Sequence, residues 1–187
     1  MLFATCRSPA TALGLDALKY SPSDVTDADG IKVGCLKVLE LLNGTGLDYV
    51  INNAAINRRT DLPFSFDPAV LAEMIKCNIT GLALVTRFLL LAIEKSSGKV
   101  IVNMSSAFAS ISKDLSPKST SYSISKTELN MLTYKQMREH PHFIPILMDP
   151  GRVKTDMCGK GAVIEPHVSV TGILNVFYNY LGNQNPW

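Results

Sequence analysis

The sequence predicts an α/β fold in which a mostly parallel sheet is covered by helices on both faces. Short apolar runs of strand length alternate with helical patterns of ten or more residues, and this alternation implies right-handed crossovers between parallel strands. Several apolar runs also end in small polar residues, as buried strands do where they open onto a ligand crevice. A chain of 187 residues is long enough for one such domain and too short for two ordinary ones.

The first part of the chain predicts two strands and two helices. A short strand covers residues 2–5, and a helical stretch with proline and alanine follows it. The turn and cap residues Asp24-Val25-Thr26-Asp27 then mark the end of a second strand. From about 29 to 42, apolar side chains recur at helical spacing until Asn43-Gly44-Thr45-Gly46 supplies a stop.

The rest of the chain continues the alternation. An apolar run over 47–51 leads into Asn52-Asn53-Ala54-Ala55, and Pro68 begins a long helical region that reaches about Lys95. A buried strand follows over 98–104 and leads into Ser105-Ser106. Further elements are a helix over about 119–139, a strand over 143–148 that leads into Asp149-Pro150-Gly151, and a last helix over about 168–181.

Composition and charge narrow the class of protein. Apolar residues make up 47% and charged residues 18%, the balance of a globular protein. The net charge is +2 with basic residues scattered among acids, so nucleic acid is not an expected partner. The longest apolar stretch, residues 88–93, is far below the roughly 20 residues of a membrane span. It is expected to be a buried helix segment, and no membrane partner is expected.

The start of the chain and the cysteines bear on location and on metals. Residues 1–7 lack the basic region and long apolar core of a signal peptide, so a cytoplasmic location is expected. The four cysteines, at positions 6, 35, 77 and 158, show no CxxC spacing and have no histidine at metal-ligand distance. Neither a metal site nor a disulfide framework is therefore predicted.

Tyr122 and Lys126 are the first candidates for chemistry. They lie four residues apart in a predicted helix, which places both side chains on one face. A nearby cation favours the phenolate and lowers the pKa of a tyrosine, and such a tyrosine can act as a general acid toward a carbonyl oxygen or as a base toward an alcohol. The spacing taken alone favours a surface pair on an amphipathic helix.

Five segments in order and spacing together resemble the short-chain dehydrogenase/reductase family. They are Asn52-Asn53-Ala54-Ala55, Cys77-Asn78-Ile79-Thr80-Gly81, Val102-Asn103-Met104-Ser105-Ser106, Tyr122-Ser123-Ile124-Ser125-Lys126 and Asp149-Pro150-Gly151-Arg152-Val153-Lys154-Thr155. The resemblance covers essentially the whole chain. Residues 3–7 and 153–157 look closest to the sniffer-like carbonyl reductases. The family implies a Rossmann-like, doubly wound sheet in three α/β/α layers, and hydride transfer between NADP(H) and a carbonyl or alcohol.

The resemblance also implies roles for individual residues. Tyr122 would be the acid/base, and Ser106 would polarise the substrate oxygen, with Ser105 as the alternative serine. Lys126 would hold the nicotinamide ribose and lower the pKa of Tyr122, and Asn78 would anchor a proton-relay water. Structural alternatives remain for two of them: Asn78 could bond free backbone groups at a helix kink, and Ser106 could cap the following segment.

The implied cofactor contacts lie on several loops. Arg7 resembles the position that meets the adenosine 2′-phosphate, which favours NADP over NAD. Asp24 and Val25 would contact the adenine, although Asp24 could equally be only a helix cap. The remaining contacts would line the cofactor and cover its nicotinamide side: Asn53, Ala54, Pro150, Gly151, Val153 and Thr155. The expected partners are a small-molecule carbonyl or alcohol substrate and a possible homo-oligomer.

The chain departs from the family at its start. Met1 falls where the family's second strand begins, so we expect one NAD(P)-binding domain over 1–187 that lacks the first strand, the glycine-rich phosphate loop and the first helix, and whose C-terminal end is altered. The missing strand would divide the sheet at its centre and leave two unpaired edges. Two alternatives to an active enzyme therefore stay open: a truncated, impaired pseudoenzyme or interaction subunit, and a fragment of a longer enzyme.

Overall fold

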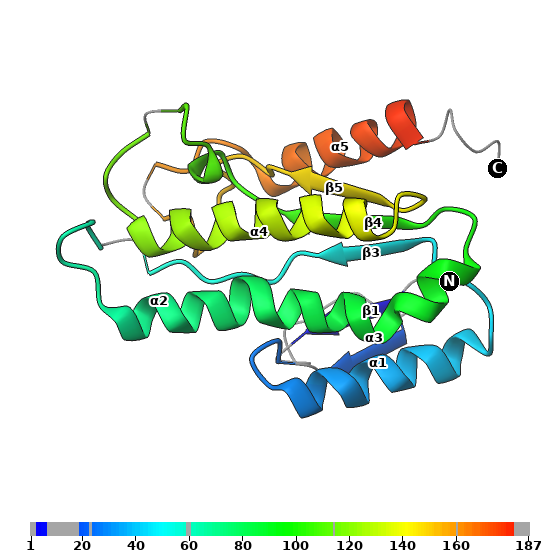
Figure 1. The fold of residues 1–187 in the computed structure, drawn as a ribbon. Coiled ribbons are helices and arrows are strands. Elements are labelled where there is room, and N and C mark those ends of the chain that lie inside the picture. The colour runs from blue at the N-terminus through cyan, green and yellow to red at the C-terminus, as the bar shows by residue number, and fades with distance from the viewer. Residues whose placement is uncertain are drawn as a thin grey trace.

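The computed structural model describes residues 3–6, 19–22, 24–58, 61–113, 115–159 and 161–181. Strands lie between two layers of helices, with α1, α3 and α4 on one face and α5 on the other (Figure 1). The strands are β1 (Phe3–Cys6), β2 (Lys19–Pro22), β3 (Tyr49–Asn52), β4 (Val100–Met104) and β5 (Ile144–Met148). The larger helices are α1 (Ala28–Leu42), α2 (Pro68–Ile75), α3 (Gly81–Lys95), α4 (Thr120–Glu139) and α5 (Pro166–Val176).

The described residues also form three short helical turns, which the sequence did not predict. A π-helical turn, η2 (Lys76–Thr80), interrupts the long helical region between α2 and α3, and a second one, η4 (Phe177–Leu181), follows α5. A 3₁₀ turn, η3 (Ala107–Ala109), follows β4. Each is a single turn whose spacing differs little from that of an α-helix or a loop over so few residues, so hydrophobic periodicity does not reveal it.

The strands form two separate parallel sheets within the described part of the chain. β1 pairs with β2, and β3, β4 and β5 form a three-stranded sheet in that order. The prediction of a Rossmann-like parallel sheet is confirmed, and so is the division between its two halves. Within the described residues, β1 and β3 therefore each have one edge without a paired strand.

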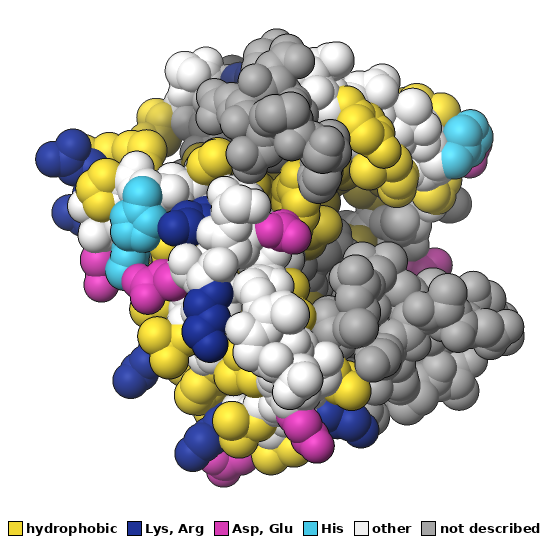
Figure 2. Space-filling view, turned by 90° about the vertical axis from the view of Figure 1, so that its right-hand side faces the viewer, with side chains coloured by type: hydrophobic (Ala, Val, Ile, Leu, Met, Phe, Trp, Pro, Cys, Tyr) yellow, Lys and Arg dark blue, Asp and Glu magenta, His cyan; other side chains and the backbone are white. Residues whose placement is uncertain are grey.

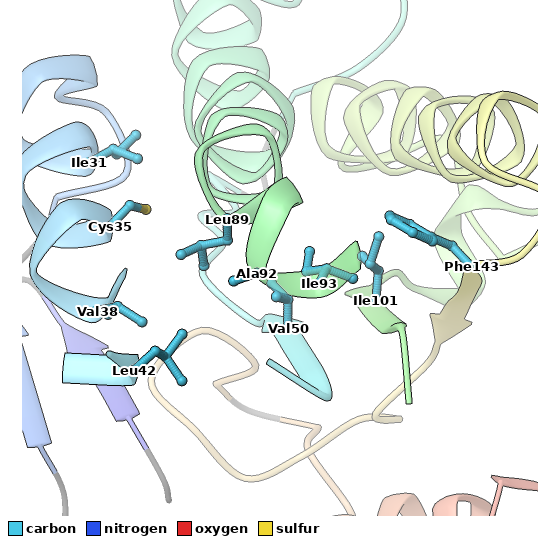
Figure 3. Packing of buried hydrophobic residues seen from close by; sticks show 10 residues of the cluster. All are labelled: Ile31, Cys35, Val38, Leu42, Val50, Leu89, Ala92, Ile93, Ile101 and Phe143. Carbon is cyan, nitrogen blue, oxygen red and sulfur yellow. The ribbon is translucent and has the colours of Figure 1, made fainter. Parts of the chain in front are cut away.

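The core lies on both faces of the three-stranded sheet. On one face, Val50 and Ile101 contact a cluster in which α1 contributes four buried side chains that point toward those of α3 (Figure 3). On the other face, Val100, Val102 and Met104 pack against residues of α5 and η4. The alternation of side chains along β4 thus supplies both cores, which explains why every residue of this strand is buried.

A buried polar network joins the sheet to its helices. Asn52 and Asn103 are register partners on β3 and β4, and Asn52 Nδ2 donates to Asn103 Oδ1 at 2.8 Å and to Thr86 Oγ1 on α3 at 3.0 Å. Asn103 Nδ2 in turn donates to Thr133 Oγ1 on α4 at 2.8 Å. Because these amides are buried, their mutual bonds fix the register of β3 on β4 and the position of both helices.

The segment Pro68–Lys95 is a continuous 28-residue helical region of high hydropathy. By length and composition alone it could cross a membrane, and it is longer than the apolar run at 88–93 suggested. However, 44% of its most apolar window is buried inside the protein, where α3 packs on α1 and β3. Leu89, Ala92 and Ile93 are core residues, as predicted for a buried helix segment.

Candidate active site

The carboxyl ends of β3, β4 and β5 meet at one edge of the sheet, and the predicted catalytic residues lie beyond it. Ser106 follows β4, Tyr122 and Lys126 lie in the first two turns of α4, and Asn78 lies in the π-helical turn η2. These four residues are called the buried cluster below. A chain of contacts links them, although they come from three separate parts of the sequence.

Tyr122 is the centre of the buried cluster. It is 8% exposed, its ring packs edge-on to Phe108 at 6.2 Å, and its side chain is hydrogen-bonded to that of Ser106. Burial raises the pKa of Tyr122, the bond to Ser106 opposes this, and the charges of Asp149 and Cys158 reinforce it. The phenol is therefore protonated at neutral pH.

Lys126 is the most deeply buried charged side chain among the described residues, at 1% exposure. Its Nζ donates to the Met104 carbonyl at 2.7 Å and lies 5.8 Å from the centroid of the Tyr122 ring. Burial lowers the pKa of Lys126 to about 8. The predicted lowering of the Tyr122 pKa by Lys126 is not seen, because burial is the largest effect on this pKa and raises it.

Asn78 uses its whole amide to connect the η2 turn to two other segments. Its Oδ1 accepts from Ile56 N at 2.8 Å, and its Nδ2 donates to Ile56 O at 3.0 Å and to Ser125 Oγ at 3.0 Å. The alternative that Asn78 bonds backbone groups is therefore partly correct. The backbone groups belong to Ile56 in the loop after β3, and not to the helix kink as predicted. Asn78 thereby ties this loop to α4.

The two candidate serines differ in their partners. Ser105 is buried, and its hydroxyl donates to Asn130 Oδ1 at 2.6 Å on the inner face of α4. Ser106 is half-buried beside Tyr122, and it also caps η3 by accepting from Phe108 N at 3.3 Å. The capping alternative for Ser106 therefore holds together with its contact to Tyr122. Of the two, only Ser106 is bonded to the tyrosine.

Two loops with predicted cofactor contacts border the buried cluster, and they are called the rim here: residues 53–54 after β3 and residues 150–155 after β5. Asn53, Gly151 and Thr155 are exposed, whereas Ala54, Pro150 and Val153 are half-buried. The second loop is held by Ser169 Oγ, which donates to Pro150 O at 2.7 Å, and by the bridge between Val153 and Ile164. Gly151 has φ +77°, a conformation that favours glycine.

Asp24 and Val25 lie between β2 and α1. Asp24 Oδ1 accepts from both Thr26 N and Thr26 Oγ1 at 2.8 Å. The cap of α1 is Asp27, whose side chain accepts from Asp29 N, so Asp24 closes a turn and is not the helix cap. Val25 packs closely against Gly81, and a methyl group added at Gly81 would overlap the Val25 carbonyl oxygen. This contact places the loop beside the start of α3.

The described residues suit the nicotinamide ribose of a dinucleotide better than its pyrophosphate. Tyr122, Lys126 and the rim offer donors and a close backbone approach for a nicotinamide ribose. The described helices α1, α2 and α5 instead have the acidic N-cap residues Asp27, Asp67 and Glu165, whose charge opposes a pyrophosphate at these ends. Arg7, the predicted 2′-phosphate contact, lies outside the described residues.

Sequence reasoning missed three residues that position this site. Ser125 lies inside the Tyr122–Lys126 segment, and it receives the Asn78 bond and donates to Tyr122 O at 2.8 Å. Asn130 holds Ser105, and Asp61 Oδ2 accepts from Ser121 N at 2.7 Å at the start of α4. The i, i+4 spacing from Lys126 to Asn130 was a signal that could have been used, whereas Asp61 lies in a loop without a motif.

Comparisons with known proteins agree with the fold and the order of the motifs. The family model for short chain dehydrogenases matches residues 5–162. The NADPH-bound carbonyl reductase from chicken fatty liver superposes with a TM-score of 0.85 at 31% identity and covers 98% of this chain and 82% of its own. Carbonyl reductase Sniffer of D. melanogaster, at 24% identity and the same coverage, has the same fold with a TM-score of 0.88.

A curated relative extends the comparison. C-signal of Myxococcus xanthus is 27% identical in a 154-residue alignment that covers 75% of this chain and 93% of that protein. The family match covers far more than half of the chain and includes the segments that carry Asn78, Ser106, Tyr122 and Lys126. The protein belongs to the short-chain dehydrogenase family, resembles the sniffer-like carbonyl reductases within it, and is by family an NAD(P)-dependent oxidoreductase.

Proposed function

We propose that this protein interconverts a carbonyl and an alcohol with NADP(H) through Ser106, Tyr122 and Lys126, supported by Asn78. The observation that carries the proposal is the position of Tyr122: its side chain interacts with that of Ser106, and its ring centroid lies 5.8 Å from Nζ of the buried Lys126. A neutral phenol and a serine hydroxyl side by side provide two donors for one substrate oxygen, the arrangement that carbonyl reduction requires.

In the reducing direction the proton comes from Tyr122. Because burial raises the pKa of Tyr122, the phenol holds its proton at neutral pH and can deliver it to the carbonyl oxygen as negative charge develops there. Ser106 Oγ orients that oxygen and donates a second hydrogen bond. In the oxidising direction the phenol must first lose its proton, so alcohol oxidation is the direction that needs higher pH.

Lys126 would hold the cofactor, and Asn78 positions the loop beside the site. The Lys126 ammonium can turn from Met104 O to the ribose hydroxyls of a nicotinamide nucleotide, which supplies the hydride when it is bound. Asn78 holds Ile56 and Ser125, and so fixes the loop after β3 against α4. Any water that relays protons to Tyr122 would lie along this line of polar groups.

NADP is the proposed form of the cofactor because Arg7 offers a guanidinium for a 2′-phosphate. Arg7→Ala is expected to weaken NADPH binding about tenfold or more and to leave NADH binding unchanged. Equal losses for both nucleotides would contradict this role and assign Arg7 to the fold. The substrate is proposed as a small carbonyl compound or alcohol without further definition.

A second candidate function is supported by the divided sheet. β1–β2 and β3–β4–β5 share no ladder in the described residues, and the acidic N-caps of α1, α2 and α5 do not favour a pyrophosphate. A protein of this family that binds no nucleotide would serve as an impaired pseudoenzyme or interaction subunit. One relative, at 27% identity, carries the name C-signal, which names no reaction.

Titration of the protein with NADPH, followed by nucleotide fluorescence, separates the two candidates. The enzyme proposal expects saturable binding that Lys126→Ala weakens at least about tenfold. Lys135→Ala is the matched control, since Lys135 is exposed on the same helix. A folded protein without saturable NADPH binding would refute the enzyme proposal and support the second candidate. Folding is checked in each variant by circular dichroism and by a cooperative thermal transition.

A further inference from the structure

A second group of polar side chains lies at the opposite edge of the sheet from the buried cluster. Glu94 near the end of α3, and His140 and His142 between α4 and β5, bring one ligand atom each to within 4.8 Å of one another. These segments precede β4 and β5, so they lie at the edge where the strands begin. Figure 2 views the molecule from this side and shows histidine and acidic side chains adjoining on the surface.

The local fold holds both imidazoles in place. Phe143 N donates to His140 O at 2.9 Å, which closes a turn with Pro141 at its second position. The Phe143 ring is buried in the core, the His140 ring stacks on it at 4.7 Å, and the His142 ring meets it edge-on at 4.8 Å. One anchored ring thus orients two histidines that are only two residues apart.

Glu94 completes the group from another element. Its neighbour Ile93 is fully buried, which fixes this turn of α3. Glu94 Oε1 lies 3.6 Å from His140 Nδ1, and the two side chains are 38% and 23% exposed. Solvent therefore reaches the group, and an ion would need no buried path to enter.

Two imidazoles and one carboxylate form a donor set that suits a borderline divalent metal. Zn²⁺ binds such ligands at about 2.0–2.2 Å, whereas Mg²⁺ and Ca²⁺ prefer oxygen ligands alone. Tetrahedral bonds of this length place ligand atoms about 3.4 Å apart. The widest separation in the group therefore has to contract by up to about 1.4 Å, which rotation of partly exposed side chains can supply.

We propose that Glu94, His140 and His142 bind a zinc-class divalent cation, with water in the fourth position. The ion would connect the end of α3 to the turn before β5. It would do so away from Ser106 and Tyr122, so its role is to stabilise this edge and is independent of the proposed oxidoreductase function. The proposed ligands include no cysteine.

Zinc binding to the chelator-treated protein is measured by competition with a chromogenic chelator. The expected result is one equivalent of bound Zn²⁺, a higher melting temperature with Zn²⁺, and no shift with Mg²⁺. His142→Ala and Glu94→Gln should each weaken zinc binding at least about tenfold. His167→Ala is the matched control, because His167 is the third histidine of the chain and lies exposed on α5.

Cobalt provides a spectroscopic check on the ligands. Co²⁺ bound at this site should show visible ligand-field absorption without the near-ultraviolet band of a cobalt–thiolate bond, and His142→Ala should remove that absorption. A thiolate band, or zinc affinity that is unchanged in both His142→Ala and Glu94→Gln, would overturn the proposal. Equal loss of affinity in His167→Ala would also overturn it, since it would show unspecific binding by surface histidines.

Discussion

The buried cluster and the rim lie at the same edge of the sheet but are held in different ways. Every member of the buried cluster is bonded to other protein groups, as Asn78 is to Ile56 and Ser125 and Lys126 is to Met104. In the rim, Asn53, Gly151 and Thr155 face solvent. The comparison teaches that the groups proposed to handle protons are preorganised by the fold itself, whereas the proposed cofactor contacts lie on loops. Substitutions in the buried cluster should therefore change kcat or stability, whereas substitutions in the rim should change the affinity for NADPH.

The largest expected effect comes from the centre of the buried cluster. Tyr122→Phe removes the proposed proton donor but keeps the ring against Phe108. We expect kcat for NADPH-dependent carbonyl reduction to fall about 10²–10⁴-fold, the usual contribution of a general acid. NADPH affinity should change less than about threefold. A Tyr122→Phe variant with near-normal kcat would show that the proton comes from elsewhere.

The next effect is a dependence of stability on pH through Lys126. Burial lowers its pKa from the ordinary 10.5 to about 8, so between these values the unfolded state binds more protons and stability rises with pH. The difference in unfolding free energy between the wild type and Lys126→Met should shift by up to about 3 kcal/mol in favour of the wild type from pH 8 to 10.5.

This comparison of two proteins is needed because another group acts in the opposite sense. Burial raises the pKa of Cys35 from 9.0 to about 11, which removes stability over that range in the wild type and the variant alike. Taking the difference between urea titrations cancels the Cys35 effect. A difference that stays constant from pH 7 to 10.5 would contradict the buried, low-pKa lysine. Lys135→Met serves as the exposed control.

A smaller effect is expected from paired asparagines in the two regions. Asn78→Ala leaves Ile56 N, Ile56 O and Ser125 Oγ without their partner, and should cost about 2 kcal/mol of unfolding free energy. The same change at exposed Asn53 should cost less than about 0.5 kcal/mol. Urea denaturation measures both. Equal costs at the two sites would erase the contrast between the buried cluster and the rim.

The smallest effect is expected for the far end of the rim. Thr155 is exposed, and its hydroxyl makes a long contact of 3.4 Å to Val153 O. Thr155→Ala should raise the Kd for NADPH about three- to fivefold through one lost hydrogen bond, with stability unchanged. Fluorescence titration beside a thermal melt tests this. A loss of stability with unchanged Kd would assign Thr155 to the loop and not to the cofactor.

Local patterns predicted the elements to within a few residues. The helix expected from about 29 to 42 is α1, Ala28–Leu42, and it ends where Asn43 adopts a left-handed conformation. The expected helix at 119–139 is α4, Thr120–Glu139. The strands before Asn53, Ser105 and Asp149 also lie where apolar runs placed them. These predictions succeed because helix periodicity, caps and strand runs are properties of neighbouring residues.

The sequence by itself therefore determined the order of elements, the family and the shared face of Tyr122 and Lys126. Only the tertiary structure decided that Lys126 is buried against Met104 O, that Asn52 meets Asn103 across β3 and β4, and that Glu94 meets two histidines more than 40 residues away. Each of these contacts depends on strand register and on the packing of helices. Register and packing are set by burial over the whole sheet and leave no periodic signal in a local stretch of sequence.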